Sequence, residues 1–314
     1  MDKNLYKLLI SITLFATMIS CKPTCELVSL DLRDFKAVSI GGRVKAEAVE
    51  SKVYPVSHPD KFTFSLKNTN GSIRVSGKPT REISIRAEKV AYGEDQQQAE
   101  KRLEELIIVY EKKTDELSIR AKPPGVTIGG RSPRVDFIIS LPETLRQVNV
   151  HSVNGRIDVR HVNSTFDLHS SNGAIDVEGS GDMEVSTTNG RIGVRGGNGE
   201  IRASTTNGNI DIDANNSKVS ASSTNGRITL KLRSPEQTDA HTTNGNISAD
   251  ISEARSIKVE AGARKAWRLY LSGFDKVEKR KGLFQNSATA ILGDGKVRME
   301  FKTTNGSIEV RVTR

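Results

Sequence analysis

The dipeptide Asn-Gly recurs along this chain at a nearly constant spacing. It occurs nine times in 314 residues, and six of its occurrences begin at Asn154, Asn172, Asn189, Asn207, Asn225 and Asn244. The successive steps between these six are 18, 17, 18, 18 and 19 residues. A repeat of this length is typical of proteins that stack many copies of one small structural unit.

Alignment of the units on their Asn shows two groups of apolar positions. In the first unit, Val148 and Val150 precede the Asn, and Ile157 and Val159 follow it. The position three residues after the Asn is isoleucine in all six units: Ile157, Ile175, Ile192, Ile210, Ile228 and Ile247. A spacing of two places both side chains of a group on one face of a strand. Each unit therefore contains two short strands, each with one apolar face.

Two architectures use Asn-Gly turns. A β-hairpin pairs strands within one unit, and this pairing does not by itself call for identical residues in successive units. A β-solenoid does, because its coils lie about 4.8 Å apart and equivalent side chains stack. We therefore predict an all-β, parallel, single-chain β-solenoid of 18 residues per coil over residues 146–314. Its Asn-Gly corners are expected to need positive φ, with Asn side chains hydrogen-bonded along the stack.

The region before the repeat, residues 31–145, has irregular strand patterns and one helical segment. Aromatic residues make up only 5% of the chain and glycine occurs 26 times, which favours short strands and turns. The helix is expected at residues 94–107, where Ala99, Leu103 and Leu106 form an apolar side. We expect this region to cover one end of the solenoid, since an uncovered sheet edge invites pairing with other chains.

The first 20 residues have the pattern of an export signal peptide. Lys3 and Lys7 precede an apolar run that is too short to span a bilayer, and Ser20 precedes Cys21. This arrangement resembles a bacterial lipoprotein cleavage site, which would make Cys21 the lipidated residue and residues 21–30 a tether. Met18 stands where that motif usually has Leu, and the alternative is a cleaved signal with an ordinary Cys. We expect an exported protein attached to a membrane by its lipid; whether the membrane is the inner or the outer one stays open.

A basic segment interrupts the repeat at residues 252–302. Residues 255–302 contain 12 Lys and Arg against 5 Asp and Glu, in a chain of net charge +9. The segment is either an insertion between two coils or a terminal cap. It mixes cations with aromatic residues, which suits an anionic lipid or envelope polymer, although another protein is also possible and Trp267 could instead plug the solenoid end. Nucleic acid is a poor partner for an exported protein. The candidate surface consists of Arg264, Lys265, Trp267, Arg268, Lys279, Arg280 and Lys281.

Two polar columns of the repeat contain residue types that can bind a metal or catalyse a reaction. His151 and His169 lie one coil apart, with Asp167 as the one nearby carboxylate, so they are weak metal ligands and we predict neither a metal nor a cofactor. Asp158, Asp176 and Asp211 also stack, as the acids of a polysaccharide-active enzyme would, with Asp158 and Asp176 as the candidate pair. Gly193 interrupts that column and Arg or Lys alternates with it, which favours solvated charge. We therefore predict no catalytic residue and keep the polysaccharide-active enzyme as the alternative.

The Ser/Thr-Thr-Asn-Gly-x-Ile-x-Val units and the closing TTNGSIEV resemble a bacterial family of adhesin-like domains of unknown function. The resemblance covers nearly all of residues 31–314. It implies an exported or membrane-attached β-solenoid, and for some members a context of envelope stress. It implies no catalytic residues. We therefore expect a non-catalytic envelope lipoprotein that binds or scaffolds at the cell surface, of unknown oligomeric state.

Overall fold

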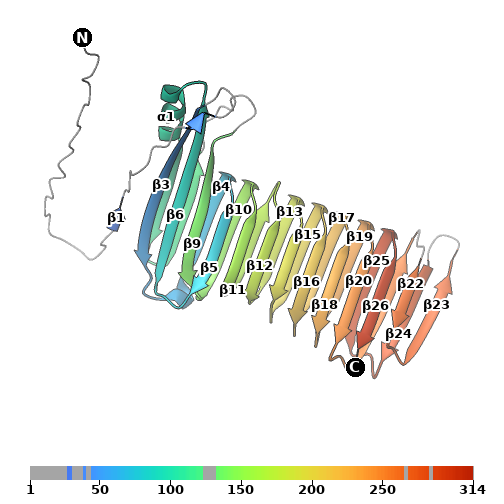
Figure 1. Ribbon diagram of the computed structural model, residues 1–314. Helices are drawn as coiled ribbons and strands as arrows, with labels where there is room; N and C mark the ends of the chain where they lie inside the picture. The colour runs from blue at the N-terminus through green and yellow to red at the C-terminus, as the bar shows by residue number, and fades with distance from the viewer. Residues whose placement is uncertain are drawn as a thin grey trace, which may run out of the picture.

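The computed structural model describes residues 27–29, 38–39, 44–122, 132–264, 268–282 and 286–313. The described residues form strands almost throughout, and Figure 1 shows these strands side by side in one long row. The helical elements within these ranges are α1 (Gln96–Glu104) and a 3₁₀ turn, η1 (Pro59–Lys61). The strands are β1 (Leu27–Ser29), β2 (Val38–Ser39), β3 (Val44–Pro55), β4 (Thr63–Asn70), β5 (Ile73–Lys78), β6 (Glu82–Gly93), β7 (Ile107–Lys113), β8 (Glu116–Lys122), β9 (Arg134–Pro142), β10 (Thr144–Asn154), β11 (Ile157–Ser170), β12 (Ile175–Ser180), β13 (Met183–Asn189), β14 (Ile192–Gly196), β15 (Glu200–Asn207), β16 (Ile210–Asn215), β17 (Lys218–Asn225), β18 (Ile228–Arg233), β19 (Thr238–Asn244), β20 (Ile247–Ser252), β21 (Ile257–Ala263), β22 (Leu269–Ser272), β23 (Lys276–Lys281), β24 (Asn286–Leu292), β25 (Val297–Asn305) and β26 (Ile308–Thr313).

The row consists of two ladders of strands that share one core. Sheet 1 contains the strands that lead into the Asn-Gly corners, in the spatial order β7-β8-β4-β10-β11-β13-β15-β17-β19-β25-β21-β24-β23. Sheet 2 contains the strands that follow the corners, in the order β3-β6-β9-β5-β11-β12-β14-β16-β18-β20-β26-β22. β11 is long enough to contribute to both sheets. The repeating strands pair in parallel, so the predicted β-solenoid is confirmed.

The column of isoleucines forms the centre of the core. Ile157, Ile175, Ile192, Ile210, Ile228 and Ile247 pair in register from coil to coil, and each is at most 1% exposed. Complete burial of such a side chain stabilises a fold by about 1.5–3 kcal/mol. A column of one residue type also sets the register, because a slip by one position would turn every isoleucine toward solvent.

The corner asparagines form a continuous line of side-chain hydrogen bonds, which confirms the predicted stacking. Each amide Nδ2 donates to the Oδ1 of the neighbouring coil's asparagine at 2.7–2.9 Å. The line runs through Asn70, Asn154, Asn172, Asn189, Asn207, Asn225, Asn244 and Asn305. These exposed amides use both donor and acceptor, so they connect one corner of the coils along the whole stack.

The expectation of positive φ at these corners was wrong. Among the corner residues only Gly71 has a positive φ, of 118°. The glycines are required for a different reason, namely the close approach of the neighbouring coil. A Cβ atom on Gly208 would lie 1.9 Å from the carbonyl oxygen of Gly190, and the other repeat corners are equally tight. Positive φ occurs instead on the opposite edge of the coils, for example at His161 and Asn216.

A second line of hydrogen bonds lies just inside the corners and was not predicted. Buried Ser and Thr hydroxyls donate to the glycine carbonyl of the neighbouring coil at 2.9–3.3 Å. Thr187, for example, is 5% exposed and donates to Gly173 at 3.0 Å. These bonds explain why the unit has Ser or Thr two residues before the Asn, since a buried hydroxyl needs a partner.

The stack extends to the N-terminal side of residue 146. β4 and β5 form a coil that lies between the β8–β9 coil and the β10–β11 coil, although it precedes both in sequence. Beyond these coils, the long antiparallel strands β3 and β6 continue sheet 2, and β1 pairs with β3. Both ladders therefore run without interruption through the predicted boundary at residues 145 and 146.

The predicted helix is present but shorter than residues 94–107. α1 begins after Asp95, whose carboxylate accepts a 2.7 Å hydrogen bond from the Gln98 N–H as an N-cap. It ends at Glu104 because β7 begins three residues later. Figure 1 shows α1 against the far end of β3 and β6, where Ala99 and Leu103 pack in a small apolar cluster separate from the main core.

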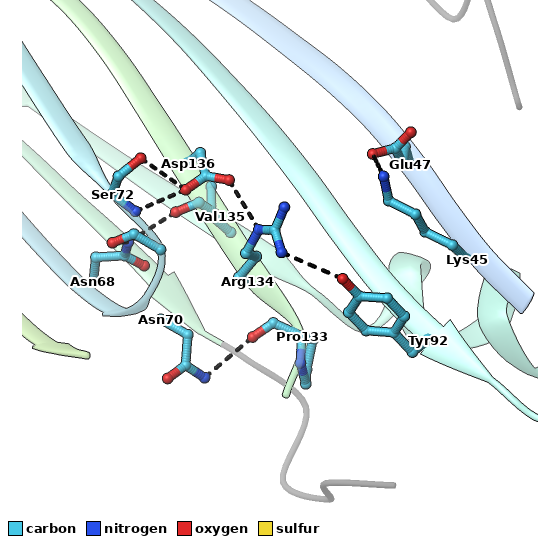
Figure 2. A network of polar contacts seen from close by, with 11 residues as sticks. Lys45, Glu47, Asn68, Asn70, Ser72, Tyr92, Pro133, Arg134, Val135 and Asp136 are labelled. Carbon is cyan, nitrogen blue, oxygen red and sulfur yellow. Dashed lines mark hydrogen bonds and ion pairs between the residues drawn. The ribbon is translucent and has the colours of Figure 1, made fainter. Parts of the chain in front are cut away.

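A polar network joins the first coils at this end of the stack (Figure 2). One Asp136 carboxylate oxygen accepts hydrogen bonds from the Ser72 N–H at 2.7 Å and from its hydroxyl at 2.9 Å, and the other accepts from Arg134 at 3.0 Å. Arg134 also donates to the Tyr92 hydroxyl at 3.3 Å. Burial raises the pKa of Asp136, but these hydrogen bonds and the guanidinium outweigh it, so its pKa lies below the ordinary value.

The basic segment is an insertion in sequence and a cap in space. The last coil of the sequence, β25–β26, stacks directly on β19 and β20. The preceding strands β21 and β22 form a further coil on its outer side, and the β23–β24 hairpin follows β21 in sheet 1. The segment is therefore both an insertion between two coils and a terminal cap. After β20 the chain leaves one coil position empty, builds the outer coil and the hairpin, and then returns so that β25 and β26 occupy that position.

Candidate functional site at the C-terminal cap

Strand β23 is the outermost strand of sheet 1 and presents mostly cations. All six of its residues, Lys276–Lys281, are exposed, and within the described ranges it pairs only with β24. Its outer edge therefore has unpaired backbone groups. Lysines along such an edge oppose pairing with another sheet, which is one role of this composition.

A depression of about 370 Å³ lies on the outer face of sheet 1, over β17, β19, β25 and β21. Its floor contains Gly262, which has no side chain and pairs in register with Lys302. Arg264, Lys302 and His241 lie around it, together with several hydroxyl-bearing residues. The same row of the sheet continues through Ser287 to Arg280, each in register with the strand before. Cationic groups therefore border a hollow where one side chain is missing.

Carboxylates of the cap form ion pairs with neighbouring cations, whereas several of its arginines form none among the described residues. Glu260 lies 2.8 Å from Lys258 and 3.1 Å from Arg298, and the hydrogen bond from Lys258 first of all lowers the pKa of Glu260. Arg264 and Arg280 form no side-chain hydrogen bond or ion pair with another residue in the described ranges. The hydrogen bond from Lys276 lowers the pKa of Glu278 most, and the charge of nearby Arg280 also helps to lower it, but the N–H donors of both arginines stay available to an external anion.

The predicted surface residues divide by environment. The Lys279 ammonium donates to the Leu269 carbonyl oxygen of β22 at 3.1 Å, so this lysine connects the two sheets across the open end of the core. Lys281 and Arg268 are exposed at the ends of β23 and β22. Lys265 and Trp267 lie outside the described residues, as does Cys21. Sequence reasoning missed Lys302 and Gly262, although alignment of Lys302 with the His241 column would have indicated the former.

The two stacked imidazoles, His151 and His169, lie on the outer face of sheet 1 toward the other end. Their ring centroids are 6.0 Å apart. His151 Nε2 lies 3.1 Å from Asp167, and His169 Nδ1 lies 2.9 Å from the Ser186 hydroxyl. No group of three or more potential metal ligands occurs in the part of the chain that the structure describes. These imidazoles are therefore engaged with polar neighbours within the column.

The stacked carboxylates of sheet 2 are held by arginines. Asp176 accepts from Arg156 on one oxygen and from Arg191 on the other, both at 2.7 Å. Asp158 accepts from Arg160 on both oxygens, at 2.8 and 3.0 Å, which raises the pKa of Arg160. Carboxylates fixed in this way are poorly suited to transferring protons, since bound guanidinium groups favour the ionised form.

A family model with the description Toastrack DUF4097 matches residues 44–267, which is more than half of the chain. The chain belongs to the Toastrack family. No curated protein matches it. The match ends inside the cap, so the cationic hairpin and the last coil of this Toastrack chain lie beyond the matched residues.

Two solved structures are similar to this chain at low sequence identity. A candidate adhesin from Bacteroides fragilis is 15% identical, with a TM-score of 0.44, and the match covers 84% of this chain and 97% of the other. A candidate lipid-binding protein from Parabacteroides distasonis is 12% identical, with a TM-score of 0.47 and coverages of 85% and 97%. At such identities their names say nothing about the ligand of this Toastrack protein.

Proposed function

We propose that this Toastrack protein is a non-catalytic binding protein of the bacterial cell envelope, whose C-terminal cap binds an anionic envelope polymer. The observation that carries this proposal is a cationic row on the outer face of sheet 1, in which Arg264 borders the hollow over Gly262 and Arg280 lies two strands farther out on β23. Neither guanidinium forms a side-chain hydrogen bond or ion pair within the described ranges. Arginine without an internal partner on an otherwise neutralised surface favours carboxylate or phosphate groups supplied from outside.

The shape of the molecule supports contact at a distance. Eleven strand-to-strand steps of about 4.8 Å separate β8 from β23 in sheet 1, so the cap lies about 50 Å from the first coils. β1 pairs with β3 at that opposite end. A lipid on Cys21, six residues before Leu27, would lie within about 20 Å of β1. The proposed anchor and the proposed binding surface are therefore at opposite ends of a rigid stack.

A non-catalytic role is favoured by the state of the two adjacent carboxylates that suggested acid–base chemistry. Asp158 and Asp176 use both oxygens in contacts to arginines. In the described ranges no helix is long and apolar enough to cross a membrane. The proposed attachment is through a lipid on Cys21. A single acyl chain anchors only reversibly, whereas several chains anchor stably.

The test is co-sedimentation with isolated anionic cell-wall polymer by the mature protein and by an Arg264→Ala/Arg280→Ala variant. The wild type should bind, binding should weaken as salt rises, and the variant should lose about tenfold in affinity. The matched control is Lys67→Ala/Arg120→Ala, which removes two exposed cations from the other end of sheet 1, where they pair in register. Equal binding by both variants would exclude the cap as the binding surface.

Anionic vesicles distinguish a polymer from a membrane. Phosphatidylglycerol vesicles that bind the wild type as tightly as the wall polymer would contradict the choice of polymer. For the anchor, metabolic labelling with a palmitate analogue should mark the wild type and not a Cys21→Ala variant. Equal labelling of both would show that Cys21 is not the lipidated residue.

A further inference from the structure

The middle of sheet 2 contains a second hollow, on a surface remote from the cap. It has a volume of about 390 Å³ and lies over β12, β14 and β16. This size falls within the range of small-molecule sites, about 300–1,000 Å³. The hollow exists because Gly193 interrupts an outward column in which the neighbouring coils have a side chain.

Four charged residues enclose Gly193 in a cross. Along the chain, Arg191 precedes β14 and lies two residues before Gly193, and Arg195 lies two residues after it within β14. Across the ladder, Asp176 and Asp211 pair with it in register on β12 and β16. Successive outward residues on a strand and neighbours across a ladder are both within several ångströms. Two cations therefore face each other in one direction and two anions in the other.

One side of this hollow is held in place and the other is free. Asp176 is fixed between Arg156 and Arg191, and its Oδ1 would lie 2.5 Å from a Cβ atom on Gly193, so the carboxylate leans over the glycine. Arg195 and Asp211 form no side-chain hydrogen bond or ion pair with any residue that the structure describes. On the Asp176 side the donors and acceptors are already in use, and the free pair supplies unused ones.

The balance of charge defines the ligand chemistry. An anion in the hollow would be repelled by the carboxylates of Asp176 and Asp211. A cation would be repelled by the guanidinium groups of Arg191 and Arg195, so a charged ligand of neither sign is favoured. A hydroxyl group both donates and accepts, which suits a carboxylate and a guanidinium at once. Adjacent hydroxyls of a sugar ring can donate to a carboxylate and accept from a guanidinium group around Gly193. We propose that this hollow binds one unit of a neutral saccharide, with Arg195 and Asp211 as the principal contacts.

This site is independent of the function proposed for the cap, because it lies on the other sheet and selects for the absence of net charge. The two can be tested separately. A cap variant should leave saccharide binding unchanged, and a variant of the hollow should leave binding of the anionic polymer unchanged.

The decisive variant fills the hollow without disturbing the fold. Gly193→Thr introduces the residue that the same column has at Thr229, two coils away, where it pairs in register with Asp211. Gly193 has no positive φ, and its Cβ would meet side-chain atoms of Asp176 and no backbone atom, so the carboxylate must shift while the strand keeps its place. Ser248→Thr, in the same column on β20, is the matched control. An Asp211→Asn variant tests the contact with no change of volume.

The mature protein is titrated calorimetrically with chitohexaose, cellohexaose and mannohexaose, and with hexagalacturonate as the anionic comparison. At least one neutral oligosaccharide should bind with a Kd of about 1 mM or tighter. Gly193→Thr and Asp211→Asn should each weaken it about tenfold, while Ser248→Thr should not. The proposal is overturned if none of the three neutral probes binds, if hexagalacturonate binds more tightly than all of them, or if both variants bind like the wild type.

Discussion

The Asn305 amide donates a 2.7 Å hydrogen bond to Asn244, although 61 residues separate the two in sequence. In the regular part of the repeat the same bond joins asparagines 17–19 residues apart. The chain thus leaves the stack after β20, builds the outer coil and the hairpin of the cap, and returns to fill the position it had passed over. The line of amides continues through this detour without a gap.

The line of amides should contribute measurably to stability. Asn207→Ala removes one hydrogen bond donated to Asn189 and one accepted from Asn225, both of 2.8 Å. We expect a loss of about 1–2 kcal/mol in the free energy of unfolding, since an exposed bond contributes about 0.5–1.5 kcal/mol. Urea denaturation measures it. Ser204→Ala on the same strand is the control and should change little; an equal effect of both would show that the amides do not matter.

The corner glycines should be much less replaceable than the glycine of the hollow. Gly208→Ala places a Cβ atom 1.9 Å from a backbone oxygen, and Gly193→Ala places one 2.5 Å from the Asp176 Oδ1, a side-chain oxygen that can shift at the cost of exposed hydrogen bonds alone. We expect a cost of more than about 3 kcal/mol for Gly208→Ala and less than about 1 kcal/mol for Gly193→Ala. Thermal unfolding compares the two. Similar melting temperatures would refute the explanation by close approach.

The Asp136 network should make the N-terminal end of the stack sensitive to acid. The pKa of Asp136 is lower when folded than the ordinary value of about 3.9, so its stabilising contribution is complete above that value. The contribution is lost as the pH falls through the lowered, folded pKa. Asp136→Asn should therefore destabilise the wild type at pH 7 and converge with it under acid conditions. Denaturant unfolding at several pH values tests this, and a difference that does not change with pH would contradict it.

The outer coil should depend on the last coil for its order. A chain ending at residue 296 lacks β25 and β26, which separate β21 and β22 from the rest of the stack. We expect the amides of β21 and β22 to lose protection from hydrogen exchange, while those of β12–β16 keep it. A stack consists of nearest-neighbour contacts, so the effect should remain local. Protected amides in β21 of the truncated chain would show that the cap folds by itself.

The sequence by itself determined the architecture of the repeat. Columns of identical residues at a constant period require coils in register, because only stacking places equivalent side chains in contact; the isoleucine core and the amide line followed from this. It also indicated the helix, the basic segment and the Asp158–Asp176 column.

Only the tertiary structure decided how the coils are ordered and which charges are free. The pattern of one coil does not specify its neighbour, so the late insertion of β25–β26 and the early coil β4–β5 could not be predicted from the period. The same holds for the corner glycines, whose role depends on a carbonyl from the next coil. The availability of Arg264 and Arg195, and the engagement of Lys279, likewise depend on contacts between strands distant in sequence, and such contacts exist only once the coils are stacked.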